Sequence, residues 1–243
     1  MAIADLFRPV CKTFGFSKAA VSDNEQKQVE DQQKQFEQIL NVANKIAKQN
    51  PQALPTFVRL LARKLQGQYM SAALMWTAPG RTPELEPGVV WFSEVAVLSR
   101  EGALLYYLKK RLPSTRILNL STDVILPWPW DLIRLERCLS FIGTKQNPWK
   151  QDTRNHRVEY WLPFGIGWVR GGNHSIMTGI LQGRQQLETD EVYDLSAIFP
   201  LVHCDGIAFR RTADNSVIAP VHDVQFAAIY EVGRLMLLNG ISA

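Results

Sequence analysis

Apolar residues in the first third of the chain recur at helical spacing. Between Asn24 and Gln49, a polar segment rich in Gln, Lys and Glu carries an apolar residue roughly every three, four or seven positions. This pattern predicts a helix with one narrow apolar stripe. The stripe is too short to separate a coiled-coil or dimer seam from a helix that lies along its own domain, and we favour the second. Pro51 and Pro55 end this helix, and residues 56–65 start another.

A stretch rich in proline and glycine, residues 78–88, follows the second helix. Because this composition is typical of linkers, we expect a domain boundary here. The chain would then consist of a helical N-terminal extension, residues 1–88, and an α/β domain, residues 89–243.

The second part of the chain alternates between β-rich and helical patterns, which favours an α/β (α+β) fold with a mixed sheet and packed helices. Strands are expected at 89–97, 117–126 and 187–193, a strand pair or one long strand is expected at 158–169, and a hairpin should join 207–211 to 217–221. Helices are expected at 101–112, 132–142 and 223–238, with one more from about Asn173 to a stop at Gly183. The helix after Asp131 should turn four apolar side chains inward: Leu132, Leu135, Leu139 and Ile142.

Composition narrows the class of protein without naming a function. The hydrophobic content of 46% and the charged content of 21% are those of a soluble globular protein. A net charge of +4 permits contact with nucleic acid or an acidic partner but does not require either. The three cysteines are widely spaced, which argues against a disulfide framework and fits a reducing cytoplasm. We find no signal peptide and no apolar run near the ~20 residues of a membrane span.

The stretch that organises the candidate chemistry runs from Trp168 to Ile180. An apolar strand leads into Gly171 and Gly172, and a helix begins at Asn173. The free N–H groups at the start of such a helix favour an anion, most often a phosphate. A tight turn that carries a satisfied histidine explains the same residues equally well.

Other kinds of site lack their residue spacing. His156, His174, His203, His222 and Cys204 form no pair with metal-ligand spacing, so we predict no metal site from them. Adjacent residues on a helix do not face each other, so His174 and Ser175 are not a catalytic pair. The chain contains no P-loop and no GxGxxG motif. Phosphate binding at the glycine turn remains, and the carboxylates that could hold a hydrated Mg²⁺, unless they are helix caps or surface charges, are Asp131, Asp152, Glu159 and Glu191.

Roughly residues 115–195 resemble the ParB/sulfiredoxin superfamily. The shared pattern is a strand that ends in a proline-rich stretch, an amphipathic helix that ends in glycine, and a strand that leads through a glycine turn into a helix. Its most specific part is residues 170–175, and the resemblance implies that this turn binds nucleotide phosphate. Asn173 stands where sulfiredoxin has its cysteine, which excludes a sulfinic acid reductase. Ser175 replaces the usual arginine, and no helix-turn-helix domain follows Tyr193, which argues against a partition protein.

Within the superfamily, the chain is most similar to plasmid fertility inhibition proteins of the Osa and FiwA type. This resemblance implies binding of ATP or another nucleotide, possible ATPase and DNase activity, and a block of conjugative transfer through a type IV secretion system. We expect Mg²⁺, DNA and secretion or coupling proteins as further partners. The alternatives are a non-catalytic interaction protein and a DNA-binding regulator that uses the basic helix near Arg59.

The resemblance also implies roles for single residues. The catalytic candidates are His174, Asp131 and Glu159. The nucleotide-binding candidates are Arg170, Gly171, Gly172, Asn173, His174 and Ser175. The candidates for contact with DNA or a partner are Arg134, Arg137 and Arg154.

Overall fold

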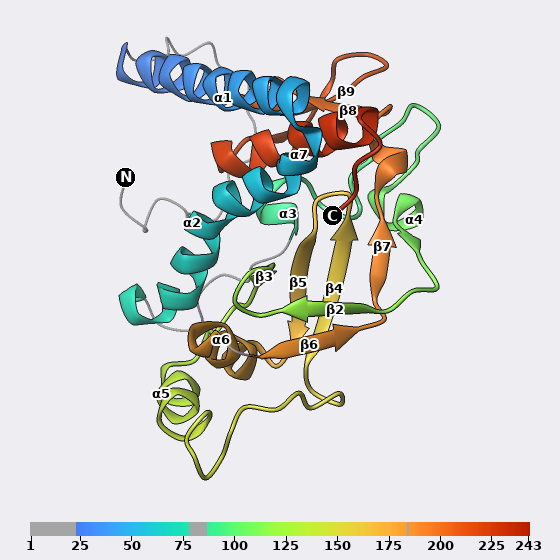
Figure 1. The fold of residues 1–243 in the computed structure, drawn as a ribbon. Helices are drawn as coiled ribbons and strands as arrows, with labels where there is room; N and C mark the ends of the chain where they lie inside the picture. Colours follow the sequence, from blue (N-terminus) through green and yellow to red (C-terminus); the bar gives the residue numbers. More distant parts are fainter. Residues whose placement is uncertain (1–22, 78–86, 184) are drawn as a thin grey trace.

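The computed structural model describes residues 23–77, 87–183 and 185–243. Two long helices, α1 (Asp23–Gln49) and α2 (Leu54–Met75), are joined by the 3-10 turn η2 (Pro51–Ala53). Both pack against the C-terminal helix α7 (Val224–Leu238) (Figure 1). These helices confirm the helical patterns at both ends of the chain.

A mixed five-stranded sheet forms the centre of the molecule. Its strands lie in the order β1-β7-β4-β5-β3, with β4 and β5 antiparallel in the middle and the parallel neighbours β7 and β3 beside them. The strands are β1 (Lys110–Arg111), β3 (Val124–Leu126), β4 (Arg157–Leu162), β5 (Ile166–Gly171) and β7 (Val192–Asp194). Side chains alternate between the two faces of such a sheet.

Both faces of this sheet are covered, which accounts for the nearly continuous apolar run from Tyr160 to Val169. Trp161 and Trp168 lie on the face that packs against α2 and α7. Val158 and Val169 lie on the other face, which packs against α6 (Asn173–Gln182) and the two-stranded sheet of β2 (Arg116–Asn119) and β6 (Gln186–Thr189).

The remaining elements are short. A second antiparallel sheet is formed by β8 (Val202–Cys204), β9 (Ala208–Arg211) and β10 (Val217–Pro220), and its β9–β10 pair confirms the predicted hairpin. The short helical segments are α3 (Pro87–Val90), α4 (Leu105–Leu108) and η3 (Ser196–Ile198). Helix α5 (Leu132–Phe141) lies beside α6 at the edge of the molecule (Figure 1).

Two predicted elements are wrong, and the strands expected at 117–126 and 187–193 are each divided into two strands that belong to different sheets, β2 and β3 in the first case and β6 and β7 in the second. Residues 89–97 form no strand, because the first two residues end α3 and the rest of the segment has an irregular conformation with a single bridge, from Val97 to Leu104. Val90, Trp91 and Phe92 are buried and the Nε1–H of Trp91 donates to the Phe226 carbonyl at 2.7 Å, whereas Val95 and Val97 are exposed. The helix expected at 101–112 is limited to α4, since Lys110 and Arg111 pair with β7 instead.

The inward face of α5 is also smaller than predicted. Leu135 is buried, whereas Leu132 and Leu139 are exposed. The reason is the peripheral position of α5, which touches the rest of the protein along one side. Periodicity alone does not tell how many sides of a helix are covered.

The N-terminal helices share one core with the sheet. Phe36 of α1 and Val58 of α2 belong to the same buried cluster as Trp161 and Phe226. Helix α1 therefore lies along its own domain, as we favoured. The division expected at residue 88 is not a division of this core, and most of the proposed linker lies outside the described residues. None of the described helices is long and apolar enough to cross a membrane.

Candidate functional site

The predicted strand, glycine turn and helix are present at residues 166–183. Strand β5 ends at Gly171, Gly172 has a φ of +76°, and α6 runs from Asn173 to Gln182 and is capped by Gly183, whose φ is +69°. The turn is also tightly packed. A Cβ on Gly171 would lie 2.6 Å from the Asn155 carbonyl oxygen, and a Cβ on Gly172 would lie 2.5 Å from the His156 ring. Both positions therefore need glycine.

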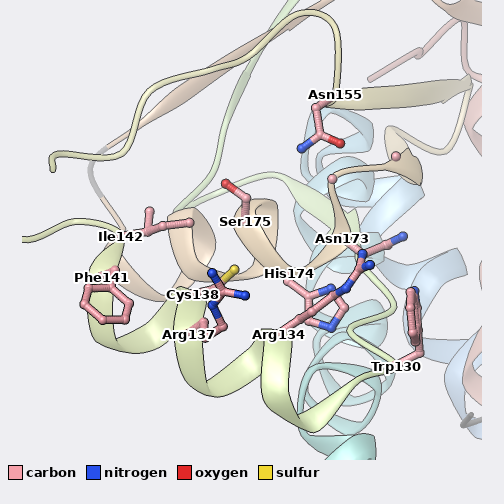
Figure 2. Close-up of a pocket in the computed structure, with 12 residues that line it drawn as sticks. Trp130, Arg134, Arg137, Cys138, Phe141, Ile142, Asn155, Asn173, His174 and Ser175 are labelled. Carbon is pink, nitrogen blue, oxygen red and sulfur yellow. The ribbon is translucent and has the colours of Figure 1, made fainter.

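A cleft of about 610 Å³ opens in front of this turn, between α5 and the start of α6. Figure 2 shows the side chains of the two helices around it. Its lining residues are Trp130, Arg134, Arg137, Cys138, Phe141, Ile142, Asn155, Gly171, Gly172, Asn173, His174 and Ser175. The structure thus brings most of the predicted nucleotide-binding residues together with two of the predicted partner-binding arginines.

His174 is buried against the N-terminal end of α5. Its Nε2 lies 3.2 Å from the Asp131 backbone nitrogen and 3.1 Å from the Asp131 carbonyl oxygen, and its ring meets Trp130 edge-on. Burial lowers the pKa of His174, although the Asp131 carbonyl and carboxylate act in the opposite direction. The imidazole is therefore neutral near pH 7 and bridges the two helices.

Asp131 and Asn173 have structural hydrogen bonds. Asp131 caps α5, since its Oδ1 accepts from the Arg134 backbone N–H at 2.8 Å. Asn173 does not cap α6, because Gly172 occupies the N-cap position and no side-chain cap bond is formed. Instead, the Asn173 Oδ1 accepts from the Trp128 backbone N–H at 2.7 Å. The bond from Trp128 to Asn173, together with the contact of His174 with Asp131, holds the start of α5 against the start of α6.

Two cations face the cleft. Arg134 and Arg137 are exposed on α5, and the Arg134 guanidinium lies 5.1 Å from the centre of the Trp130 ring. Within the described residues, neither arginine forms an ion pair with an acidic side chain. The first residues of α6, Asn173, His174 and Ser175, line the same cleft, and the free N–H groups at the start of a helix carry the positive end of its dipole. The cleft is therefore suited to an anion.

The α5–β4 loop, residues 142–156, docks on the fold beside the cleft and lines it with Ile142 and Asn155, which the sequence analysis did not predict. The Trp149 Nε1–H donates to the Ser175 carbonyl at 2.8 Å, and the Trp149 ring stacks on His156 with the planes 8° apart. His156 in turn accepts the Asp152 backbone N–H at its Nδ1. Gln151 fastens the loop to β6 through two hydrogen bonds with the Glu188 backbone. The one feature of the sequence that could have predicted this docking is Trp149, a large apolar residue within an otherwise polar loop.

Glu159 and Arg170 lie outside the cleft, on the opposite face of the sheet. Residue alternation explains this, because Arg170 points away from the side to which Gly171 leads and α6 packs. Glu159 bonds Arg170 at 3.1 Å and Lys109 at 2.8 Å, and Glu94 bonds both cations as well. Burial raises the pKa of Glu159, but the bond from Lys109 and the charge of Arg170 outweigh it and hold that pKa below its usual range.

The other predicted residues are scattered. Arg154 is 93% exposed on the α5–β4 loop, 3.7 Å from Asp152, and does not line the cleft. Among the described residues, no three His, Cys, Asp or Glu side chains gather in a way that could hold a metal ion. The four carboxylates considered for Mg²⁺ therefore do not form one site.

Comparison with known proteins gives a family and no activity. Residues 21–243 match a protein family that is described as a family of unknown function, DUF6710. No curated protein and no solved structure matches the chain significantly.

Proposed function

The chain belongs to the family DUF6710, which has no assigned activity, and we propose that it binds a phosphate-bearing ligand in the cleft between α5 and α6. One observation carries this proposal. Arg134 and Arg137, without acidic partners among the described residues, face the N-terminal end of α6 across one cleft.

The two sources of positive charge are independent of each other. The helix start offers backbone N–H groups in a fixed direction, and each arginine offers a planar fork that matches phosphate oxygens. The α6 turn itself has Ser175 where the resembled superfamily has an arginine. Arg134 and Arg137 on the facing helix supply the charge that the turn lacks.

The ligand class that the resemblance adds is a nucleotide, such as ATP. A Mg²⁺ ion would then arrive with the nucleotide phosphates and keep most of its own waters. The cleft has no cluster of carboxylates to hold the ion separately among the described residues.

The geometry of the cleft supports binding of a nucleotide but offers no free catalytic group for its hydrolysis among the candidate residues. The His174 Nε2 is engaged by the Asp131 backbone, the Asp131 carboxylate caps α5, and Glu159 lies behind the sheet. ATPase and DNase activity therefore stay predictions from the resemblance. Inhibition of conjugative transfer also rests on the resemblance alone, and it would fail if expression of the chain left the transfer frequency of a competing plasmid unchanged.

The test of the binding proposal is calorimetric titration with inorganic triphosphate and with ATP. The double variant Arg134→Gln and Arg137→Gln should lose about tenfold in affinity for each arginine, since hydrogen bonds to charged groups contribute roughly 1.5–3 kcal/mol. Arg154→Gln is the matched control, because it removes the same kind of charge from an exposed position outside the cleft. All variants should keep the wild-type melting temperature.

Two outcomes would overturn the proposal. One is the absence of binding by the wild-type protein. The other is an equal loss of affinity in the cleft variants and in Arg154→Gln, which would mean that only net charge matters.

A further inference from the structure

We infer that the end of the cleft at Phe141 is a ring-binding subsite, so that the ligand is a phosphate ester that carries a flat organic ring. The subsite consists of Phe141, Cys138 and Ile142. This inference rests on the proposed function, because it assigns the part of the ligand that lies beyond the phosphates.

The two aromatic side chains that line the cleft differ in what they already contact. Figure 2 shows Trp130 and Phe141 at opposite ends, with the arginines between them. Trp130 meets the His174 ring at 5.5 Å and the Arg134 guanidinium at 5.1 Å. Phe141 is 65% exposed and makes no ring or cation contact among the described residues. Phe141 is thus the aromatic ring with a face available to a ligand.

Two uncharged side chains, Cys138 and Ile142, line the cleft beside Phe141. Ile142 continues the apolar surface beyond the end of α5. Burial raises the pKa of the Cys138 thiol despite the nearby charges of Arg137 and Arg134, so this side chain remains a neutral thiol. A single exposed phenylalanine needs no explanation by itself. Here it stands in a cleft, beside apolar neighbours and next to cations.

The order of these residues along α5 matches a ligand with two chemically different ends. Arg134, Arg137 and Phe141 are three and four positions apart, so they lie on one side of the helix. The rise from Arg134 to Phe141 is about 10 Å at 1.5 Å per residue. A free phosphate cannot contact both ends, whereas a phosphate ester of a ring-bearing group spans them. Nucleoside phosphates are the common ligands of this kind.

The experiment compares ligands that share the phosphates and differ in the ring. Wild-type protein is titrated with inorganic triphosphate and with ATP, GTP, CTP and UTP. At least one nucleotide should bind about tenfold tighter than triphosphate, since stacking of a base on an aromatic side chain has roughly this effect. Phe141→Leu keeps an apolar side chain without the ring, and it should bring that nucleotide to the affinity of triphosphate while leaving triphosphate unchanged.

Ile133→Ala is the matched control. Ile133 is 69% exposed on the same helix and does not line the cleft, so this change should leave every affinity unaltered. If triphosphate binds as tightly as every nucleotide, or if Phe141→Leu preserves the preference, the ring subsite is wrong and the phosphate site stands. If nothing binds, the proposed function falls and takes the subsite with it.

Discussion

On the face of the central sheet that α2 and α7 cover, Glu159 and Arg170 are joined to Glu94 and Lys109 in one ion-pair network. At the cleft on the other face, the cations of α5 have no acidic partner among the described residues. The first group is closed, because every cation in it has an anion at hydrogen-bonding distance. The second is open.

This difference separates two roles that a charged residue in the sequence can have. The network residues are largely buried, with the Lys109 side chain only 8% exposed, so their charges must be paired within the protein. The cleft arginines are in contact with water and can exchange it for a ligand. We therefore expect changes in the network to alter stability and changes at the cleft to alter binding.

The largest effect should follow from Glu159→Gln. Removal of this carboxylate leaves the mostly buried Lys109 and Arg170 with Glu94 as their remaining anion, and breaking such a pair costs about 3 kcal/mol. Urea unfolding measures the loss, and the affinity for triphosphate should stay as in the wild type. Glu188→Gln, at an exposed position of β6, is the control and should change neither quantity. A Glu159→Gln protein of normal stability with weakened binding would contradict the division of roles.

A smaller loss of stability is expected from Gly172→Ala, which changes the turn between β5, the strand that carries Arg170, and α6, the helix that lines the cleft. The substitution places a Cβ at a positive φ and against the His156 ring, and it should lower the free energy of unfolding by about 2 kcal/mol. Gly102→Ala is a sharp control, because Gly102 also has a positive φ but an added Cβ there meets nothing within 4 Å. Equal losses in the two variants would show that the α5–β4 loop does not press on the turn.

The smallest effect on stability should come from lowering the pH, which protonates the histidines. Burial lowers the pKa of His156, His174 and His222, with Asp152 opposing it at His156 and Asp131 at His174. The unfolded chain, with histidine pKa values near ~6.5, then binds more protons than the folded protein. The free energy of unfolding should therefore fall as the pH drops from about 7 to about 5. NMR titration of each ring gives the pKa directly, and values at or above ~6.5 would refute this.

The strand–turn–helix at the cleft could be predicted because its signals are local. Two glycines, a helix-starting residue and a stop at Gly183 all lie within one short stretch. The hairpin and the helices at the two ends of the chain were accessible for the same reason. The continuous apolar segment Val90–Phe92 was ambiguous, since a buried irregular segment and a buried strand have the same composition.

The features of the site that could not be predicted from the sequence depend on long-range packing. Alternation along β5 places Arg170 and Gly171 on opposite faces, but the sequence does not say which face α6 covers. Spacing put Arg134 and Arg137 on one side of a helix, yet their position opposite α6 depends on the parallel pairing of β3 with β5. The bond from Trp149 to the Ser175 carbonyl joins residues that only the fold brings together.

The way α2 lies along β3 has a consequence for how the protein behaves in a crowded solution. Gln66 donates its Nε2–H to the Ile125 carbonyl at 2.7 Å, and Arg63 donates to the carbonyls of Ser121 and Thr122. The Gln66 side chain thus occupies a carbonyl of the edge strand β3 that a strand of another molecule would otherwise use, and Arg63 holds the turn just before β3. At the opposite edge, β1 is two residues long and both are charged and exposed. Short, charged edges resist the addition of further strands, so the sheet is guarded on both sides against growth into aggregates.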